Sequence, residues 1–107
     1  MHANFQPAVY ILANFKSGTD YTGVTSDMMN RIRQHRDGVF NGFSKKHGCK
    51  MLVWFELHGT METAIVREKQ IKKWNRQWKI NLIEAANPDW RDLAQDFGFK
   101  RLPYRPS

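Results

Sequence analysis

Cysteine and long apolar runs are nearly absent from this chain of 107 residues. One cysteine, Cys49, excludes an intrachain disulfide and a cysteine-based zinc site, and we expect it to be a bystander. No apolar run approaches the ~20 residues that a transmembrane helix requires. The N-terminus lacks the basic start and apolar stretch of a signal peptide. We therefore expect a cytoplasmic protein without a membrane partner.

Acidic residues are scarce relative to basic ones. Seventeen Lys and Arg oppose ten Asp and Glu, which gives a formal net charge of +7. A domain this basic often binds a polyanion such as nucleic acid, although excess lysine can also serve solubility alone. The charge concentrates between positions 67 and 79, where two tryptophans are interleaved with six basic side chains and one acid. These basic residues are Arg67, Lys69, Lys72, Lys73, Arg76 and Lys79.

The pattern of the chain predicts one domain over residues 1–107, because no repeat, low-complexity segment or linker interrupts it. Residues 8–14 and 20–24 are rich in β-formers and flank a turn signal, so they predict a hairpin. The most apolar run, residues 51–57, predicts a third strand at the centre of the sheet. The tail, residues 98–107, is predicted to be flexible.

Helix start signals follow the predicted strands. Residues 25–27 supply capping side chains before a first helix that ends near position 35 or 36. Thr60 caps a second helix, and a third covers about residues 78–86. Asn87 and Pro88 predict the N-cap and first position of a fourth helix. The expected fold class is α+β, with a small three-stranded antiparallel sheet flanked by helices.

Several polar side chains suit phosphodiester chemistry. Tyr10 and Tyr21 belong to one predicted hairpin and could lie close together, where phenols can relay protons. A tyrosine base needs a nearby cation, because the phenol pKa is near 10. Gly23 in a strand indicates a bulge or the close approach of another group. Arg31 suits a bidentate phosphate contact, or else an ordinary ion pair with Asp27 on the helix surface.

Three further residues each have a functional and a structural interpretation. His35 could be a general acid or base, or a surface histidine near a helix end. Glu68 interrupts an apolar helical stripe, which requires either a cation such as Mg²⁺ or an ion pair with Lys72. Asn87 is by default a helix cap. Four tryptophans could stack on bases, but their spacing favours the core: Trp54, Trp74, Trp78 and Trp90.

Two tripeptides bring these residues into one pattern. Ala8-Val9-Tyr10 and Tyr21-Thr22-Gly23 stand in the positions of the GIY and YIG motifs, and the chain resembles the GIY-YIG endonuclease family. The stretches YTGVTSDMMNRIRQH and REKQIKKWNRQWKINLIEAANPDWRDL are similar to its small stand-alone bacterial branch. The likeness covers about residues 7–95. It implies the nuclease fold of that family.

The resemblance also implies a role for each matching residue. Tyr10 or Tyr21 would be the general base for the attacking water, and the two are not separable at this point. Arg31 would hold the scissile phosphate, and His35 matches a helix histidine found in many members. Glu68 would bind the single divalent cation, Mg²⁺ or Mn²⁺.

The position of the family's catalytic asparagine stays open. Its spacing varies among members, and Asn87 is favoured by the following proline over Asn81. Some members place another basic residue in the loop that here carries Lys45, Lys46 and His47, and these three are not separable either.

The resulting hypothesis is a metal-dependent DNA endonuclease of low sequence specificity, structure-selective in DNA repair or processing. RNA stays open as a substrate. The rival hypothesis is a non-catalytic nucleic-acid-binding module on the same fold, and a protein-interaction domain is a third. Contacts with the phosphate backbone are expected from Lys45, Lys46, Lys69, Lys72, Lys73 and Arg76.

Overall fold

The computed structural model describes residues 6–37, 48–100 and 102. An antiparallel sheet contains β1 (Ala8–Ala13), β2 (Asp20–Thr25) and β3 (Met51–Leu57) in the order β2-β1-β3. The helical elements are α1 (Met28–Arg36), α3 (Met61–Lys72), α4 (Arg76–Ala86) and the short 3-10 helix η1 (Leu93–Phe97). The predicted α+β class is confirmed. Lys45, Lys46, His47 and most of the tail lie outside the described residues.

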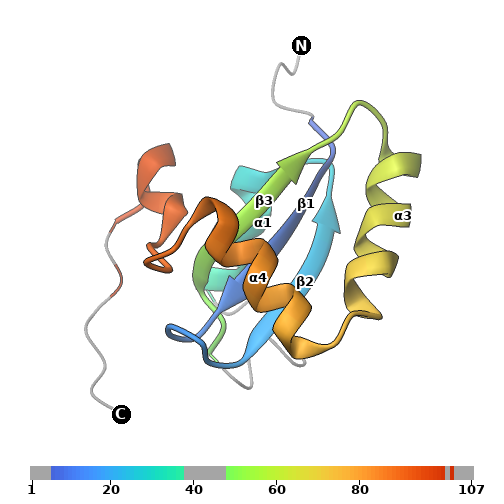
Figure 1. Ribbon diagram of the computed structural model, residues 1–107. Coiled ribbons are helices and arrows are strands. Elements are labelled where there is room, and N and C mark those ends of the chain that lie inside the picture. The colour runs from blue at the N-terminus through green and yellow to red at the C-terminus, as the bar shows by residue number, and fades with distance from the viewer. Residues whose placement is uncertain (1–5, 38–47, 101, 103–107) are drawn as a thin grey trace.

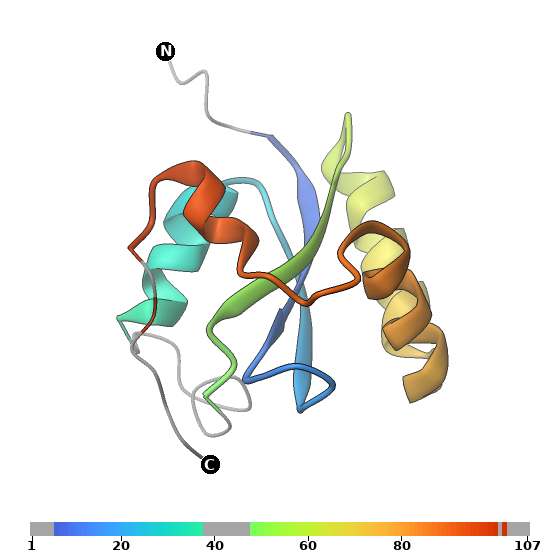
Figure 2. The same cartoon turned by 60° about the vertical axis from the view of Figure 1, so that its left-hand side comes forward.

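The sheet forms the middle of three layers (Figure 1). Figure 2 views it nearly edge-on, with α3 and α4 on one face and α1 and η1 on the other. Two cores follow from this arrangement, one on each face of the sheet. Within the part of the chain that the structure describes, no helix is long and apolar enough to span a bilayer.

β1 is the central strand, and all six of its side chains are buried. Because side chains alternate along a strand, Val9 and Ile11 enter the core beneath α3 and α4, while Tyr10 and Leu12 enter the core beneath α1. The expectation that residues 51–57 form the central strand is therefore wrong. Among the described strands, β3 pairs with β1 alone and lies at the edge of the sheet.

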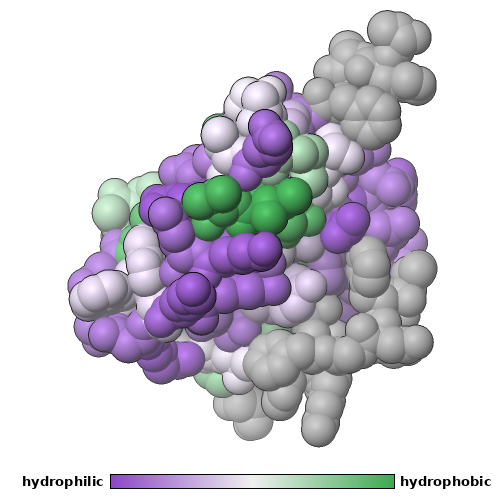
Figure 3. All heavy atoms as spheres, turned by 90° about the vertical axis from the view of Figure 1, so that its right-hand side faces the viewer, coloured by the Kyte–Doolittle hydropathy of each residue, from purple (hydrophilic) through white to green (hydrophobic). Residues whose placement is uncertain are grey.

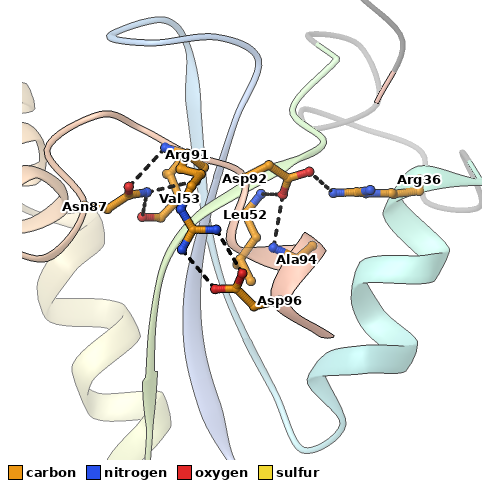
Figure 4. Close-up of polar contacts among 8 residues, drawn as sticks. All are labelled: Arg36, Leu52, Val53, Asn87, Arg91, Asp92, Ala94 and Asp96. Carbon is orange, nitrogen blue, oxygen red and sulfur yellow. Dashed lines mark hydrogen bonds and ion pairs between the residues drawn. The ribbon is translucent and has the colours of Figure 1, made fainter. Parts of the chain in front are cut away.

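The outer edge of β3 is covered at Leu52 and Val53, and its apolar side chains enter the cores on both faces of the sheet. Leu52 donates its backbone N–H to the Asp92 carboxylate over 3.1 Å, and the Asn87 amide donates to the Val53 carbonyl over 3.0 Å (Figure 4). The segment that follows α4 thus satisfies backbone groups that an edge strand otherwise leaves to solvent.

The same segment corrects the prediction of a fourth helix beginning at Asn87. Asn87 is the C-cap of α4, and its N–H donates to Ile83. Trp90 then adopts a φ of 54°, a left-handed conformation that ends any helical path. Its indole is buried, and Nε1 donates to Glu84 over 2.7 Å. The short helix η1 starts later and is capped by Asp92.

Trp78 is also placed differently from the prediction. Ile83 is the buried residue of α4, and Trp78 precedes it by five residues, about 140° around the helix. The indole is consequently 56% exposed. Trp54 and Trp90 are buried as predicted, and Trp74 is half-buried at the rim of the core.

Candidate active site

The two motif tyrosines lie on one face of the β1–β2 hairpin. Leu12 pairs with Tyr21 and Tyr10 pairs with Gly23, so the phenols are diagonal neighbours two positions apart. Their ring centroids are 6.4 Å apart. The expectation that they lie close together is confirmed.

Gly23 provides the space that the Tyr10 ring occupies. A Cβ atom at Gly23 would lie 2.5 Å from Tyr10 Cζ and 3.0 Å from Cε1, far inside van der Waals contact. The backbone at this position has no positive φ, so the requirement is one of volume. The predicted close approach is therefore confirmed, and the approaching group is the Tyr10 phenol.

His35 lies in the last turn of α1 and is buried against both tyrosines. Its ring centroid is 5.4 Å from Tyr21 and 5.9 Å from Tyr10, and Nε2 is 3.1 Å from the Tyr10 hydroxyl. Burial, with a further contribution from the Arg31 charge, lowers the pKa of His35 to about 4. The ring is therefore neutral at pH 7. With its proton on Nδ1, it accepts a hydrogen bond from Tyr10.

Arg31 and Glu68 are among the charged residues that shift the pKa of Tyr10. Burial raises the pKa of Tyr10 to about 12, and the neighbouring Tyr21 and Glu68 add to this increase. The Arg31 guanidinium opposes it through its charge and through a hydrogen bond. Tyr21, Arg31 and Glu68 therefore all act on the Tyr10 phenol, and His35 is its hydrogen-bond partner. We call Tyr10, Tyr21, Arg31, His35 and Glu68 the tyrosine cluster.

Arg31 places a permanent positive charge beside the phenols. It lies half-buried in α1, one turn before His35, and it lowers the pKa of both Tyr10 and His35. This cation is the kind of neighbour that a tyrosine base requires. A guanidinium in this position can also form two parallel hydrogen bonds with a phosphate.

Glu68 is the carboxylate of the cluster, and only 8% of it is exposed. Ala64 and Ile71 flank it on the inward side of α3. Oε2 lies 2.5 Å from Lys72 Nζ, so the structure shows the ion pair that the sequence offered as an alternative to metal binding. The Lys72 side chain is half exposed, and it can rotate into solvent without disturbing the core.

A hydrated divalent cation fits Glu68 by donor chemistry. Among the described residues, no three His, Cys, Asp or Glu side chains gather where they could hold a metal ion. Mg²⁺ does not require such a cage, because it often binds one carboxylate and keeps several waters. The cation would neutralise the carboxylate that the Lys72 ammonium neutralises in this structure.

Asn87 is not brought together with the tyrosine cluster. Its amide bonds to β3, at the opposite edge of the sheet from the β2 strand that carries Tyr21. The Asn87 amide donates to Val53 and Arg91 carbonyls and accepts from the Arg91 N–H, so it fastens the loop after α4 (Figure 4). Its competitor, Asn81, is exposed on α4 and accepts from Gln77. A catalytic role for either asparagine stays a prediction.

Of the described side chains that were predicted to contact phosphate, some are exposed and others are bound to neighbouring groups. Figure 3 faces α3 and shows an apolar patch surrounded by hydrophilic side chains. The exposed apolar side chains of this helix are Ile65 and Val66. Lys69 and Lys73 are exposed, whereas Lys72 pairs with Glu68. Arg76 donates to the carbonyls of Ser17 and Gly18, so it fastens the β1–β2 turn.

Sequence reasoning missed a buried ion pair that fixes the end of α1. Arg36 Nη2 lies 2.5 Å from Asp92 Oδ2, and both side chains are largely buried (Figure 4). The pair ties the helical turn that holds His35 to the segment covering β3. No local spacing signals a contact across 56 residues; Arg36 alone suggests only a favourable charge at a helix C-terminus.

Cys49 takes no part in the cluster. Its thiol is buried and donates to the Thr19 carbonyl over 3.5 Å. Burial, followed by the nearby Asp20 charge, raises the pKa of Cys49 to about 11. The thiol therefore stays protonated at neutral pH, which is unlike a nucleophilic cysteine.

The sequence profile described as the GIY-YIG catalytic domain matches residues 6–81, which is more than half of the chain. A domain of this kind places the chain among the nucleases, proteins that act on nucleic acid. The chain belongs to the GIY-YIG family. The resemblance inferred from the two tyrosine motifs is thereby confirmed.

Small stand-alone proteins of this family are among the relatives. A "UPF0213 protein" of Aeromonas salmonicida (strain A449) is 30% identical over 91 residues, which cover 84% of this chain and 65% of the relative. A second from Staphylococcus saprophyticus is 36% identical over 78 residues, covering 73% of this chain and 94% of the relative.

A solved structure supports the fold. The solution NMR structure of a UPF0213 protein from Bacillus halodurans matches with a TM-score of 0.53 at 28% sequence identity. The match covers 84% of this chain and 95% of the other.

Proposed function

We propose that this chain is a metal-dependent endonuclease that hydrolyses phosphodiester bonds in DNA with low sequence specificity. The observation that carries the proposal is the shared environment of Tyr10, in which a second phenol, a guanidinium and a carboxylate all shift its pKa. A non-catalytic binding surface has no need of a largely buried carboxylate among its cations.

Arg31 is proposed to hold the scissile phosphate. It is the permanent cation beside the two phenols. A phosphate bound there would add negative charge next to His35 and favour its protonated form, opposite to the effect of Arg31.

Tyr21 is the better candidate for the general base. Tyr10 is fully buried, and its hydroxyl is directed to His35 Nε2. Tyr21 is half-buried on the same face and can contact a water molecule from solvent. We assign Tyr10 and His35 to positioning, because both rings pack against the Tyr21 ring.

Glu68 would hold Mg²⁺ or Mn²⁺ after Lys72 rotates away. The bound cation would neutralise charge that develops on the phosphate and the leaving oxygen. Glu68 itself would orient the hydrated ion from the rigid inward side of α3. Asn87 would support the site through the loop that it fastens.

A cleavage panel tests the proposal. Duplex, nicked, branched and single-stranded DNA, together with RNA, would be incubated with Mg²⁺, Mn²⁺ or EDTA. We expect DNA cleavage that requires a divalent cation, with a preference for branched or nicked forms if the protein acts in DNA repair. Absence of cleavage for every substrate in both metals would contradict the proposal.

One observation favours a second function, a nucleic-acid-binding module without catalysis. Lys72 already satisfies Glu68, so the carboxylate has a structural partner in the absence of metal. This function predicts gel retardation of DNA with no cleavage in any divalent metal. It also predicts that Glu68→Gln leaves DNA affinity unchanged or raises it, since the variant loses a negative charge.

A further inference from the structure

A hydroxyl without a hydrogen-bond partner is buried beneath α3. Thr22, in the middle of β2, is 4% exposed, and its Oγ1 forms no hydrogen bond with any other group that the structure describes. Burial of a hydroxyl without a partner destabilises a protein, and a valine of the same shape avoids this loss. The hydroxyl therefore requires an explanation other than packing.

The Thr22 side chain points to the face of the sheet that α3 covers. Side chains alternate along β2, and Thr22 shares its face with Val24, which packs against the core beneath α3 and α4. Its partner in register is Ile11, a member of the same core. Tyr21 and Gly23 therefore face the opposite side of the sheet.

Glu68 enters the same layer from α3. Ala64 and Ile71, one turn before it and one turn after it, belong to the core on this face of the sheet. The Glu68 side chain therefore leaves α3 on the side that faces the strands. α3 packs against β2 and lies beside it (Figure 1). Thr22 and Glu68 are thus on facing sides of one interface.

Contacts at both ends of this interface place the two residues at the same level. α3 begins four residues beyond the end of β3, which leaves the sheet at the level of Thr25. Just after α3 ends, Arg76 Nη1 lies 3.8 Å from Asp20 Oδ2, at the other end of β2. α3 and β2 therefore run antiparallel along the same length. Glu68 is seven residues from the start of α3 and Thr22 is three residues from Thr25, about 10 Å in each case.

The charge of Glu68 also acts on the tyrosine cluster across β2. Gly23, the neighbour of Thr22, has no side chain, and a Cβ atom there would overlap the Tyr10 hydroxyl. Glu68 contributes to the raised pKa of Tyr10. The carboxylate therefore lies close to the part of β2 that contains Thr22 and Gly23.

We propose that Thr22 is a positioning residue for the metal ligand: its hydroxyl donates a hydrogen bond to the Glu68 carboxylate when a divalent cation has replaced Lys72. The inference rests on the proposed nuclease function. In this structure the Lys72 ammonium holds Oε2 of the carboxylate at 2.5 Å, and its side chain is half exposed. After the ammonium leaves, the hydroxyl gains the partner that it lacks beside the ion pair. A hydrogen bond of this kind orients a metal-binding carboxylate.

Binding of Mn²⁺ to the whole protein without DNA tests the inference separately from cleavage. The concentration of free Mn²⁺ is measured by electron paramagnetic resonance during a titration. Thr22→Val keeps the shape of the side chain and removes the hydroxyl, so the Kd for Mn²⁺ should rise about 3- to 10-fold, the equivalent of one hydrogen bond. Thr22→Ser retains a hydroxyl and should restore most of the affinity.

Melting temperatures in EDTA distinguish positioning from a role in the fold. Thr22→Val should melt at or above the temperature of the parent, because it loses a buried hydroxyl that has no described partner. Thr25→Val is the matched control: Thr25 is equally buried on the same strand, but its Oγ1 accepts from the Asp27 N–H over 3.0 Å. The control should melt at a lower temperature and bind Mn²⁺ like the parent.

Each outcome bears on the inference. Equal Mn²⁺ affinities of the parent and Thr22→Val would overturn it and leave the nuclease proposal intact. A lower melting temperature for Thr22→Val would show that the hydroxyl serves the fold, and would overturn it as well. Weaker Mn²⁺ binding by Thr22→Val, restored by Thr22→Ser, supports the inference even if no DNA is cleaved, in which case the nuclease proposal alone fails. If the parent binds no Mn²⁺, the inference and the metal dependence of cleavage fail together.

Discussion

Replacing Gly23 with alanine tests the packing on which the tyrosine cluster depends. The added methyl group would lie 2.5 Å from Tyr10 Cζ and closer still to the hydroxyl. The Tyr10 side chain cannot move away easily, because its ring is fully buried and its hydroxyl is hydrogen-bonded to His35. We therefore expect the ring to be displaced at the expense of neighbouring contacts.

The magnitude follows from two contributions. Overpacking of a filled core costs about 1–3 kcal/mol. Loss of the hydrogen bond between Tyr10 and His35 adds about 0.5–1.5 kcal/mol. Gly23→Ala should thus lower the free energy of unfolding by about 2–4 kcal/mol. Any cleavage activity should fall as well, since Tyr21 rests against the displaced ring.

Urea unfolding followed by circular dichroism measures this change. Gly59→Ala is the matched control, because a Cβ atom at Gly59 meets nothing within 4 Å, and we expect a change below about 1 kcal/mol. In a Tyr10→Leu background the obstructing hydroxyl and ring are gone, so Gly23→Ala should then cost much less. An equal cost in both backgrounds would refute the steric explanation.

Three further predictions concern single side chains. In the unfolded chain His35 binds a proton below pH ~6.5, whereas burial keeps the native His35 neutral down to about pH 4. The free energy of unfolding should therefore fall as the pH decreases between these values, by up to ~1.4 kcal/mol per pH unit. In urea titrations, His35→Gln should remove this pH dependence. Asn87→Ala should lower the free energy of unfolding by about 2–4 kcal/mol, because the partners of its three hydrogen bonds lose the amide. A melting temperature equal to that of the parent would argue against this role. Lys72→Met should destabilise the metal-free protein by about 1–3 kcal/mol, because the largely buried Glu68 carboxylate loses its lysine partner. The same change should lower the Mn²⁺ concentration needed for half-maximal cleavage, and a higher requirement would contradict competition between ammonium and metal.

The elements nearest the cluster were predictable because their signals are local. The strand pattern of residues 8–14 and 20–24, the turn between them and the cap at Asp27 fix the hairpin and α1 to within a few residues. The register of the hairpin, which places Tyr10 opposite Gly23, comes from the structure and was not predicted. A glycine in a strand had already indicated a close neighbour.

The remaining features depend on contacts that are distant in sequence. Residues 51–57 are apolar because their side chains enter the cores on both faces of the sheet, as those of a central strand do. Asn87 and Asp92 bind backbone groups at the outer edge of this strand, and no local pattern predicts these contacts. The left-handed conformation of Trp90 replaces a predicted helix by a buried loop. The sequence allowed either a metal ion or the Lys72 ammonium as the partner of the Glu68 carboxylate. The structure shows the ion pair with Lys72, and metal binding stays a proposal.

Single-turnover cleavage of labelled DNA by Glu68→Gln tests the central claim most directly. Glu62, exposed six residues earlier on α3, provides the control Glu62→Gln with the same change of charge. We predict that Glu68→Gln slows cleavage in saturating Mn²⁺ by at least about 100-fold, while Glu62→Gln cuts like the parent. Equal rates for all three proteins would show that the buried carboxylate serves only its lysine partner.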